Sequence, residues 1–207
     1  MNTQNEVIYK THNTGIYSKY IKRLIDFILA LIGLIILSPL LIVIAIIIKV
    51  TSPGPVFFKQ ERIGYHQQAF KIYKFRSMCV NAEFMGDGIR ARDDDDPRIT
   101  KIGKFIRKTS IDELPQLINV VVGDMALVGP RPPVTYHPIE IGEYPEPLCH
   151  RFDVRPGVTG LAQAAIRNQG EWADRFVYDL KYVEDVTFLK DVKIIFATFS
   201  TVAKLDE

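Results

Sequence analysis

The sequence predicts an α+β protein: a small, mostly helical domain with a short β-hairpin, preceded by a re-entrant membrane helix that is broken at Ser38-Pro39. Three observations predict this fold. An uncharged apolar run covers residues 27–48, two short segments rich in β-branched and aromatic residues follow it, and apolar residues near the C-terminus recur at helical spacing. We therefore expect a polar tail over residues 1–18, the membrane helix over 19–50 and the folded domain over 51–207.

The run from Phe27 to Ile48 contains no charged residue. As a helix it would reach roughly 33 Å at about 1.5 Å per residue, which is long enough to span a bilayer. A cleavable signal peptide does not fit, because the run is too long and no small-residue cleavage site follows it. Pro39 lacks a backbone donor, so a bend is expected there, with the Ser38 hydroxyl available to bond the freed carbonyl.

Basic residues flank the run on both sides: Lys19, Lys22 and Arg23 precede it and Lys49 follows it. Because cytoplasmic flanks carry the excess of Lys and Arg, we expect both ends on the cytoplasmic face, with a helix that dips into one leaflet and returns. A single straight or kinked span is the alternative, since transmembrane helices tolerate proline. Asp26 is expected to pair with Lys22 or Arg23.

Turn-forming residues at 51–55 end the membrane element. Val56–Arg62 and Ala69–Met78 then predict two strands that can form a hairpin. Residues 81–98 are polar and include the acidic run from Asp93 to Asp96. Such a run is typical of a solvated loop, although it would also suit a metal site for a diphosphate substrate.

Two amphipathic helices are expected farther along the chain. Ile102, Phe105 and Ile106 recur at helical spacing among lysines and arginines, which predicts a short cationic helix. Apolar residues from Phe188 to Val202 recur in the same way. The apolar face of this C-terminal helix can pack in the core or lie in the interfacial layer beside lipid head groups.

Composition excludes some classes of function. The 207 residues include 26 basic and 24 acidic side chains, and the net charge of +2 does not point to nucleic acid. Cys79 and Cys149 are too few for a secreted disulfide framework and lack paired metal-ligand spacing. A reducing, cytosolic side of the membrane fits this cysteine content.

The adjacent carboxylates Asp112 and Glu113 follow a cluster of cations that ends at Arg107 and Lys108. Ser110 and Glu113 have the spacing of a helix capping box, which by itself explains the pair structurally. A functional role is also indicated, because the nearby cations could hold phosphate and a helix N-terminus presents free backbone donors to an anion.

Two arginines occur in stiff, turn-rich contexts. Arg131 stands between two prolines, and Arg155 precedes a proline and two glycines. The planar guanidinium of either residue could grip a phosphate through two hydrogen bonds. Together with the carboxylate pair and the membrane helix, these loops predict phosphoryl transfer that involves a lipid-dissolved partner.

These features resemble the bacterial sugar transferase family, the small monotopic phosphoglycosyl transferases, in their minimal catalytic form and over about Tyr20 to Lys204. The run at 164–168 departs from the glycine-containing run that many members have there. The resemblance rests on these motifs: Lys22-Arg23-Leu24-Ile25-Asp26, Ser38-Pro39, Lys71-Ile72-Tyr73-Lys74-Phe75-Arg76-Ser77-Met78, Ser110-Ile111-Asp112-Glu113-Leu114-Pro115-Gln116, Gly129-Pro130-Arg131-Pro132 and Arg155-Pro156-Gly157-Val158-Thr159-Gly160.

The resemblance implies transfer of a sugar 1-phosphate from a UDP-sugar to polyprenol (undecaprenyl) phosphate, with release of UMP. This is the first membrane step in the synthesis of a bacterial capsule, exopolysaccharide, O-antigen or glycoprotein. Asp112 would be the nucleophile that forms a covalent aspartyl phosphosugar and would also bind Mg²⁺. Glu113 would position the metal or the nucleophile, or deprotonate an incoming group. The expected phosphate- and substrate-binding residues are Lys74, Arg76, Arg107, Arg131, Arg155 and Gln163.

The resemblance also implies a place in the cell and partners. The chain is expected in the bacterial inner (cytoplasmic) membrane, among membrane lipids, with its catalytic domain and interfacial amphipathic helices on the cytoplasmic face; a homodimer is compatible with this arrangement. Two alternatives remain open. The lipid phosphate could attack the donor directly while Asp112 serves only as a metal ligand, or the chain could be a non-enzymatic scaffold anchored to the membrane.

Overall fold

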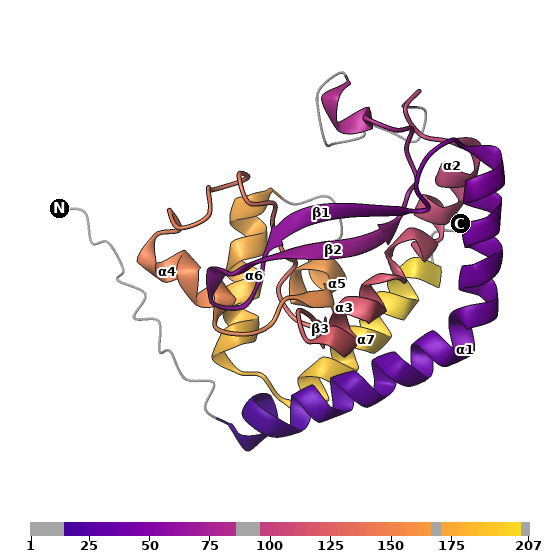
Figure 1. Ribbon diagram of the computed structural model, residues 1–207. Coiled ribbons are helices and arrows are strands. Elements are labelled where there is room, and N and C mark those ends of the chain that lie inside the picture. The colour runs from indigo at the N-terminus through magenta and orange to yellow at the C-terminus, as the bar shows by residue number, and fades with distance from the viewer. Residues whose placement is uncertain (1–14, 86–95, 167–170, 204–207) are drawn as a thin grey trace.

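The computed structural model describes residues 15–85, 96–166 and 171–203, and within them the predicted α+β fold is confirmed (Figure 1). The helices are α1 (Lys22–Thr51), α2 (Lys101–Lys108), α3 (Gln116–Val122), α4 (Glu146–Cys149), α5 (Leu161–Ile166), α6 (Trp172–Glu184) and α7 (Phe188–Ala203). The strands are β1 (Phe57–Ile63), β2 (Ala69–Phe75), β3 (Ala126–Val128) and β4 (Gly157–Thr159).

Helix α1 bends sharply partway along its length, so that its two halves run along different sides of the domain (Figure 1). Pro39 lies inside the helix and cannot donate to the carbonyl of Ile35, four residues earlier. The Ser38 hydroxyl donates to that carbonyl at 2.8 Å instead. The predicted break is therefore a bend within one continuous helix, because a side-chain donor replaces the missing backbone donor.

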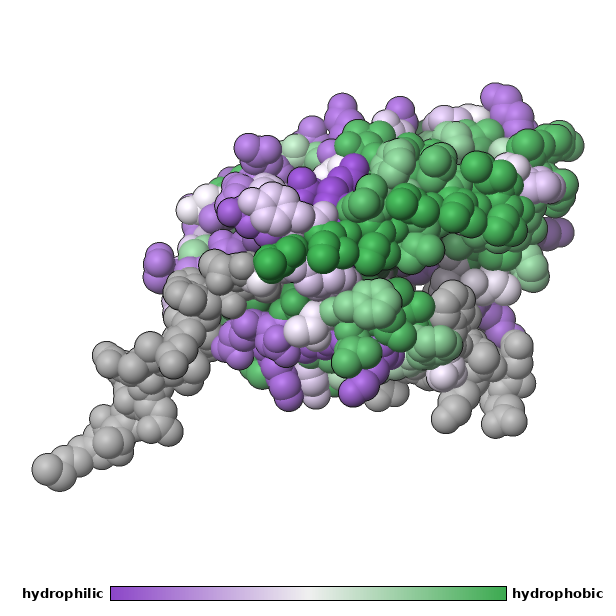
Figure 2. Space-filling model, turned by 90° about the horizontal axis from the view of Figure 1, so that it is seen from below, coloured by the Kyte–Doolittle hydropathy of each residue, from purple (hydrophilic) through white to green (hydrophobic). Residues whose placement is uncertain are grey.

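The helical segment Tyr17–Thr51 is long and apolar enough to cross a membrane by length and composition. Its first residues, Tyr17–Ile21, form a π-helical turn, so helix begins before the predicted boundary at residue 19; residues 1–14 of the predicted tail lie outside the described part of the chain. Many apolar side chains of α1 are exposed, including Ile35 and Ile36. Figure 2 shows a broad apolar area on the lower face of the molecule, where α1 lies in Figure 1.

The predicted hairpin is confirmed, because β1 and β2 pair antiparallel from Phe57↔Phe75 to Ile63↔Ala69. The buried side chain of Asn119, on α3, bonds the other edge of β2. It accepts from the Tyr73 amide at 3.0 Å and donates to the Lys71 carbonyl at 2.8 Å. Asn119 thus takes the place of a third strand and ties α3 to the hairpin.

A second, parallel pair joins β3 to β4, with Ala126 opposite Gly157 and Val128 opposite Thr159. The backbones approach so closely here that a Cβ on Gly157 would overlap the Gly129 nitrogen. Only glycine allows this contact. The pairing fixes the loop that follows β3 against the loop that precedes β4.

Both halves of α1 pack against the domain. Ala30, in the first half, contributes to a buried cluster with Ile72, Val120 and Met125. The second half contributes Ile44 and Ile48 to another cluster, which is completed by Phe75 of β2 and Ile106 of α2. The bent helix is therefore held at both ends by apolar contacts with the segments on either side of Asp112 and Glu113.

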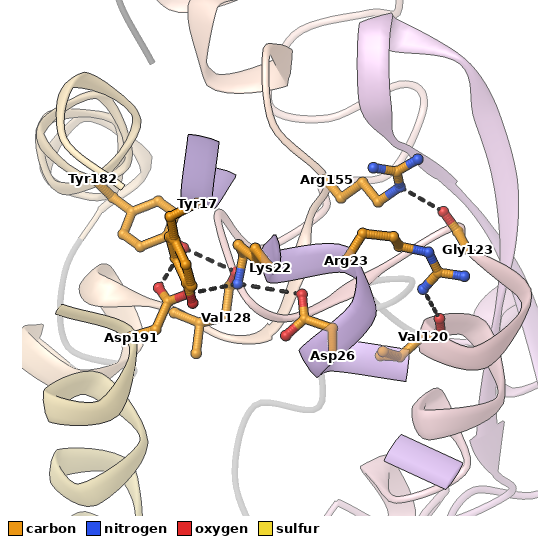
Figure 3. Close-up of polar contacts among 10 residues, drawn as sticks. All are labelled: Tyr17, Lys22, Arg23, Asp26, Val120, Gly123, Val128, Arg155, Tyr182 and Asp191. Carbon is orange, nitrogen blue, oxygen red and sulfur yellow. Dashed lines mark hydrogen bonds and ion pairs between the residues drawn. The ribbon is translucent and has the colours of Figure 1, made fainter. Parts of the chain in front are cut away.

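The C-terminal helix confirms the predicted periodicity and has two apolar faces. Ile194 is buried in the core, whereas Leu189 and Phe196 are 70% and 68% exposed. A polar cluster also ties α7 to the start of α1 (Figure 3). Asp191 accepts hydrogen bonds from Tyr17, Lys22 and Tyr182, each at 2.7 Å.

The expected pairing of Asp26 is confirmed, because its carboxylate lies 3.3 Å from the Lys22 ammonium. The loop predicted over residues 81–98 lies only partly within the described chain, since residues 86–95 are outside it. Asp96, at its end, is buried and pairs with Arg98 at 2.7 Å. For Asp96 the expectation of a solvated position is wrong, because Arg98 neutralises the carboxylate away from water.

Candidate active site

Asp112 and Glu113 lie on a single 3₁₀ turn, Ile111–Glu113, between the end of α2 and the start of α3. The capping box predicted for Ser110 and Glu113 is wrong. Ser110 has a φ of 55° and its side chain caps no helix, and α3 begins only after Pro115. The Glu113 carboxylate turns away from the backbone because two cations attract it.

Those two cations come from distant parts of the chain. The Lys74 ammonium, on β2, lies 2.6 Å from Glu113 Oε1, and the Arg131 guanidinium, on the loop after β3, lies 2.8 Å from the same oxygen. The Glu113 side chain is 25% exposed. Burial alone would raise the pKa of Glu113, but Arg131 and Lys74 hold it well below its ordinary value. Glu113 is therefore an ionised, immobilised carboxylate.

Asp112 lies in a different environment from its neighbour. No hydrogen bond or ion pair reaches its half-buried carboxylate from any residue within the described ranges. Burial, together with repulsion from Glu113, raises the pKa of Asp112 to about 6 although Lys74, Arg107 and Arg131 oppose the shift. At neutral pH the carboxylate is mostly ionised and free to react or to bind a cation.

The surroundings of the two carboxylates carry an excess of positive charge. Lys74, Arg107 and Arg131 act on Asp112, and Arg62 lies close enough for its charge to interact with Arg131 and Glu113. Burial and repulsion from Arg131 lower the pKa of Arg62 to about 10, so it too is charged at neutral pH. Four cations around two carboxylates favour an anionic ligand such as a diphosphate.

The two carboxylates differ in their capacity to bind Mg²⁺. Both Glu113 oxygens face Arg131 nitrogens, and one also faces Lys74, which leaves Asp112 as the carboxylate with free oxygens. Mg²⁺ is commonly bound through one or two carboxylates together with substrate phosphates and water. The residues present therefore fit a magnesium ion that Asp112 shares with the substrate.

The predicted site residues fall into two groups. Asp112, Glu113, Lys74, Arg107 and Arg131 are brought together. The other three bond backbone carbonyls. Arg76 donates to the carbonyls of Ser52 and Pro53 at 2.7 and 2.8 Å, and Gln163 donates to the Val158 carbonyl at 3.2 Å. Arg155 donates to the Gly123 carbonyl at 2.9 Å (Figure 3), and its guanidinium lies over the Tyr65 ring.

Sequence reasoning missed Arg62 and Arg151 as residues of this site. Arg151 is buried and Arg62 is partly buried beside the Arg131 loop, where Arg62 donates to the Pro132 carbonyl at 3.0 Å and Arg151 to the Arg131 carbonyl at 2.9 Å. Arg62 is one residue of the strand β1, and Arg151 lies in the 3₁₀ turn His150–Phe152. No local sequence motif marks either residue, because their contacts form only when the Arg131 loop folds over them.

The sequence matches the family described as bacterial sugar transferase over residues 17–205. It is 42% identical over 88% of the chain to a UDP-N-acetylgalactosamine-undecaprenyl-phosphate N-acetylgalactosaminephosphotransferase of Aeromonas hydrophila, of which it covers 44%. It is 39% identical over 92% of the chain to a UDP-glucose:undecaprenyl-phosphate glucose-1-phosphate transferase of Escherichia coli, of which it covers 42%. The chain thus spans less than half the length of these two relatives.

A relative of similar length also matches. The chain is 41% identical, over 86% of its length, to the uncharacterized sugar transferase EpsL of Bacillus subtilis, and it covers 85% of that protein. The similarity therefore extends across almost all of a small relative as well as part of larger ones.

Proposed function

The chain belongs to the bacterial sugar transferase family, and on that premise we propose that it transfers a sugar 1-phosphate from a UDP-sugar to undecaprenyl phosphate. The names of the Aeromonas and Escherichia relatives support these two substrate classes. The observation that carries the proposal is that the two neighbouring carboxylates, Asp112 and Glu113, differ in their side-chain partners. Glu113 is held by two cations, whereas Asp112 has no side-chain partner in the described chain.

In the first half-reaction, an Asp112 oxygen attacks the phosphorus that bears the sugar. The bond from this phosphorus to the oxygen that bridges the two phosphates breaks, and UMP leaves with the bonding electrons. An ionised aspartate needs no general base for this attack. The obstacle is repulsion between the carboxylate and the diphosphate, which the surrounding cations reduce.

The cations divide this work by position. Arg131 and Lys74 are fixed on Glu113, so their remaining N–H groups face a constant direction toward the transferred phosphoryl group. Arg107, on the last turn of α2, adds positive charge beside Asp112. Mg²⁺, when bound through Asp112 and the substrate phosphates, would neutralise charge on the leaving phosphate.

In the second half-reaction, a phosphate oxygen of undecaprenyl phosphate attacks the same phosphorus. The acyl phosphate bond breaks, the Asp112 carboxylate is released, and a polyprenyl diphosphate sugar forms. Donor and acceptor are dissolved in different phases, so the site must lie at their boundary. The bent α1 supports a re-entrant arrangement that places both of its ends and the domain on the cytoplasmic side of the inner membrane.

The test is a trapping experiment with the full chain in detergent. Labelled UDP-sugar and Mg²⁺, supplied without lipid acceptor, should release UMP in one stoichiometric burst and leave label on the protein. Asp112→Asn should abolish both the burst and the adduct. Asp185→Asn, which changes a carboxylate that is 71% exposed, is the matched control and should behave as the wild type.

Two outcomes would contradict parts of this proposal. Transfer without any burst in the wild type would favour direct attack by the lipid phosphate. An adduct that persists in Asp112→Asn would exclude Asp112 as the nucleophile. A panel of UDP-sugars in the same assay would identify the sugar.

A further inference from the structure

The loop after β3 contains three prolines, Pro130, Pro132 and Pro133, around Arg131. Prolines cannot donate hydrogen bonds, so the loop cannot form a regular ladder with its neighbours. Its four consecutive carbonyls nevertheless all accept hydrogen bonds from fixed donors, as follows: the Gly157 N–H donates to the Pro130 carbonyl at 3.0 Å, Arg151 Nη2 to the Arg131 carbonyl at 2.9 Å, Arg62 Nη1 to the Pro132 carbonyl at 3.0 Å and the Ile63 N–H to the Pro133 carbonyl at 2.9 Å.

The donor to the Arg131 carbonyl is itself held rigidly. Arg151 pairs with Asp179 of α6, and the two side chains are only 1% and 2% exposed. The Arg151 guanidinium also lies 5.2 Å from the centre of the Phe152 ring and 5.1 Å from that of Phe176. An ion pair enclosed in this way cannot swing, so it fixes the direction of the hydrogen bond to the Arg131 backbone.

This arrangement is hard to explain by stability alone. Apolar side chains of similar volume often replace a buried ion pair without loss of stability, because two charges lose their hydration on burial. What apolar side chains cannot supply is a donor aimed at one carbonyl. The carbonyl concerned belongs to the residue whose side chain holds Glu113 at 2.8 Å.

We propose that Arg151 and Asp179 are positioning residues: the buried pair holds the Arg131 main chain so that its guanidinium meets Glu113 and the transferred phosphoryl group. The proposal rests on the proposed function, since the reaction gives Arg131 its task. It adds a chain of contacts that starts on α6, at Asp179, and runs through Arg151 and Arg131 to Glu113.

The sharpest test replaces both members of the pair, as Arg151→Met with Asp179→Leu. This double variant should keep the thermal unfolding temperature close to that of the wild type. Its kcat/KM for the UDP-sugar should fall by roughly 10- to 100-fold, because a displacement of about 1 Å in a group that contacts the reacting atoms has an effect of this size.

The dependence on the Arg131 side chain separates positioning from general damage. In an Arg131→Gln background the double replacement should change kcat/KM by no more than about twofold, since the two changes act on one contact.

Asp96→Asn is the matched control, because it breaks another buried Arg–Asp pair, which bonds the Ala82 and Met85 carbonyls and does not contact the Arg131 loop. It should lower stability and leave kcat/KM close to that of the wild type. Amide hydrogen exchange gives a readout that does not depend on activity: the Ile63 and Gly157 amides should exchange faster in the double variant.

The outcomes separate the two proposals. A wild type that transfers no sugar phosphate contradicts the proposed function, and amide exchange then still decides whether the pair holds the loop. An active wild type combined with a double variant of unchanged kcat/KM overturns the positioning role. If the double variant does not fold, Arg151→Lys keeps the charge beside Asp179 but removes the forked donor, and the same readouts apply.

Discussion

Asp112 and Glu113 are adjacent in the chain and carry the same chemical group, yet their surroundings drive their pKa values apart. Glu113 is fixed by Lys74 and Arg131 and stays ionised, whereas Asp112 is half-buried without a partner among the described residues. Opposite shifts of two neighbouring acids are a common mark of divided roles in an active site. In the proposed mechanism, Asp112 is accordingly the reacting group and Glu113 organises the surrounding charge.

The pH dependence of the first half-reaction follows from this difference. With a pKa of about 6, Asp112 gains a proton as the pH falls through 6, and a protonated carboxyl group is a poor nucleophile. The rate of UMP release should therefore decline below pH 6 to roughly one-tenth at pH 5. Rapid-quench measurements of the burst across pH 5 to 8 would check this; a burst rate that is flat over this range would contradict the assignment.

Stability should respond in opposite directions to the two neutral replacements. Because folding raises the pKa of Asp112 from 3.8 to about 6, stability falls as the pH rises between these two values, and the penalty is fully present above pH 6. Asp112→Asn should therefore stabilise the fold at neutral pH by about 1 to 3 kcal/mol. Glu113→Gln leaves the partly buried Lys74 without its counter-charge and should destabilise the fold by about 2 to 3 kcal/mol, a value reduced for partial exposure. Denaturation of both variants in one detergent at pH 7.5 compares them directly.

At the scale of elements, the decisive feature is a long apolar helix that bends without breaking. A proline removes one donor, and the serine before it supplies another to the Ile35 carbonyl. A bend costs less free energy when the carbonyl that it frees accepts another hydrogen bond. In α1 Pro39 causes the bend, and the Ser38 hydroxyl supplies that hydrogen bond. The buried clusters on both halves of α1 then hold the bent shape against the domain.

Pro39→Ala should restore the amide donor and straighten α1. A straight helix of this length would span the bilayer, so residues near Lys19 and near Lys59 would come to lie on opposite faces. Single cysteines introduced at Lys19 and Lys59 should be labelled from the same face in the parent chain and from opposite faces after Pro39→Ala. Leu40→Ala, a neighbouring change that leaves the backbone donors intact, is the control and should keep both positions on one face.

At the scale of the whole molecule, the two ends of the described chain are joined through Asp191. Its carboxylate accepts from Tyr17 and Lys22 at the start of α1 and from Tyr182 on α6 (Figure 3). Arg23 extends this attachment, because it donates to the Val121 carbonyl at the end of α3 at 3.0 Å. The start of the helical segment Tyr17–Thr51 is thus bonded directly to α7 and α3, and through Asp191 it is linked to α6.

Asp191→Ala should detach this end of α1. It removes the acceptor of Tyr17, Lys22 and Tyr182 together and leaves Lys22 with Asp26 alone at 3.3 Å. We expect a loss of about 3 to 5 kcal/mol in the free energy of unfolding, the usual result when one member of a buried ion pair is removed. Thermal unfolding in detergent measures the loss. Asp185→Asn, which changes an exposed acid, should have almost no effect, and equal stability of the two variants would contradict the role of Asp191.

The local patterns of the sequence were sufficient for the three helices α1, α2 and α7 and for the hairpin, because each of these depends on neighbours in the chain. An uncharged apolar run predicted α1, apolar periodicity predicted α2 and α7, β-branched runs predicted the hairpin, and a proline in the apolar run predicted the bend. The sequence also singled out the carboxylate pair and Arg131, and the structure places Arg131 on Glu113. The tertiary structure decided which cations meet which carboxylates. In the structure, Arg76 and Arg155 donate to backbone carbonyls. Glu113 caps no helix and instead forms ion pairs with Lys74 and Arg131. Arg62 and Arg151 support the loop that contains Arg131, and Asp179 pairs with Arg151. These contacts join residues far apart in the sequence, and their energies depend on burial, which no local pattern specifies.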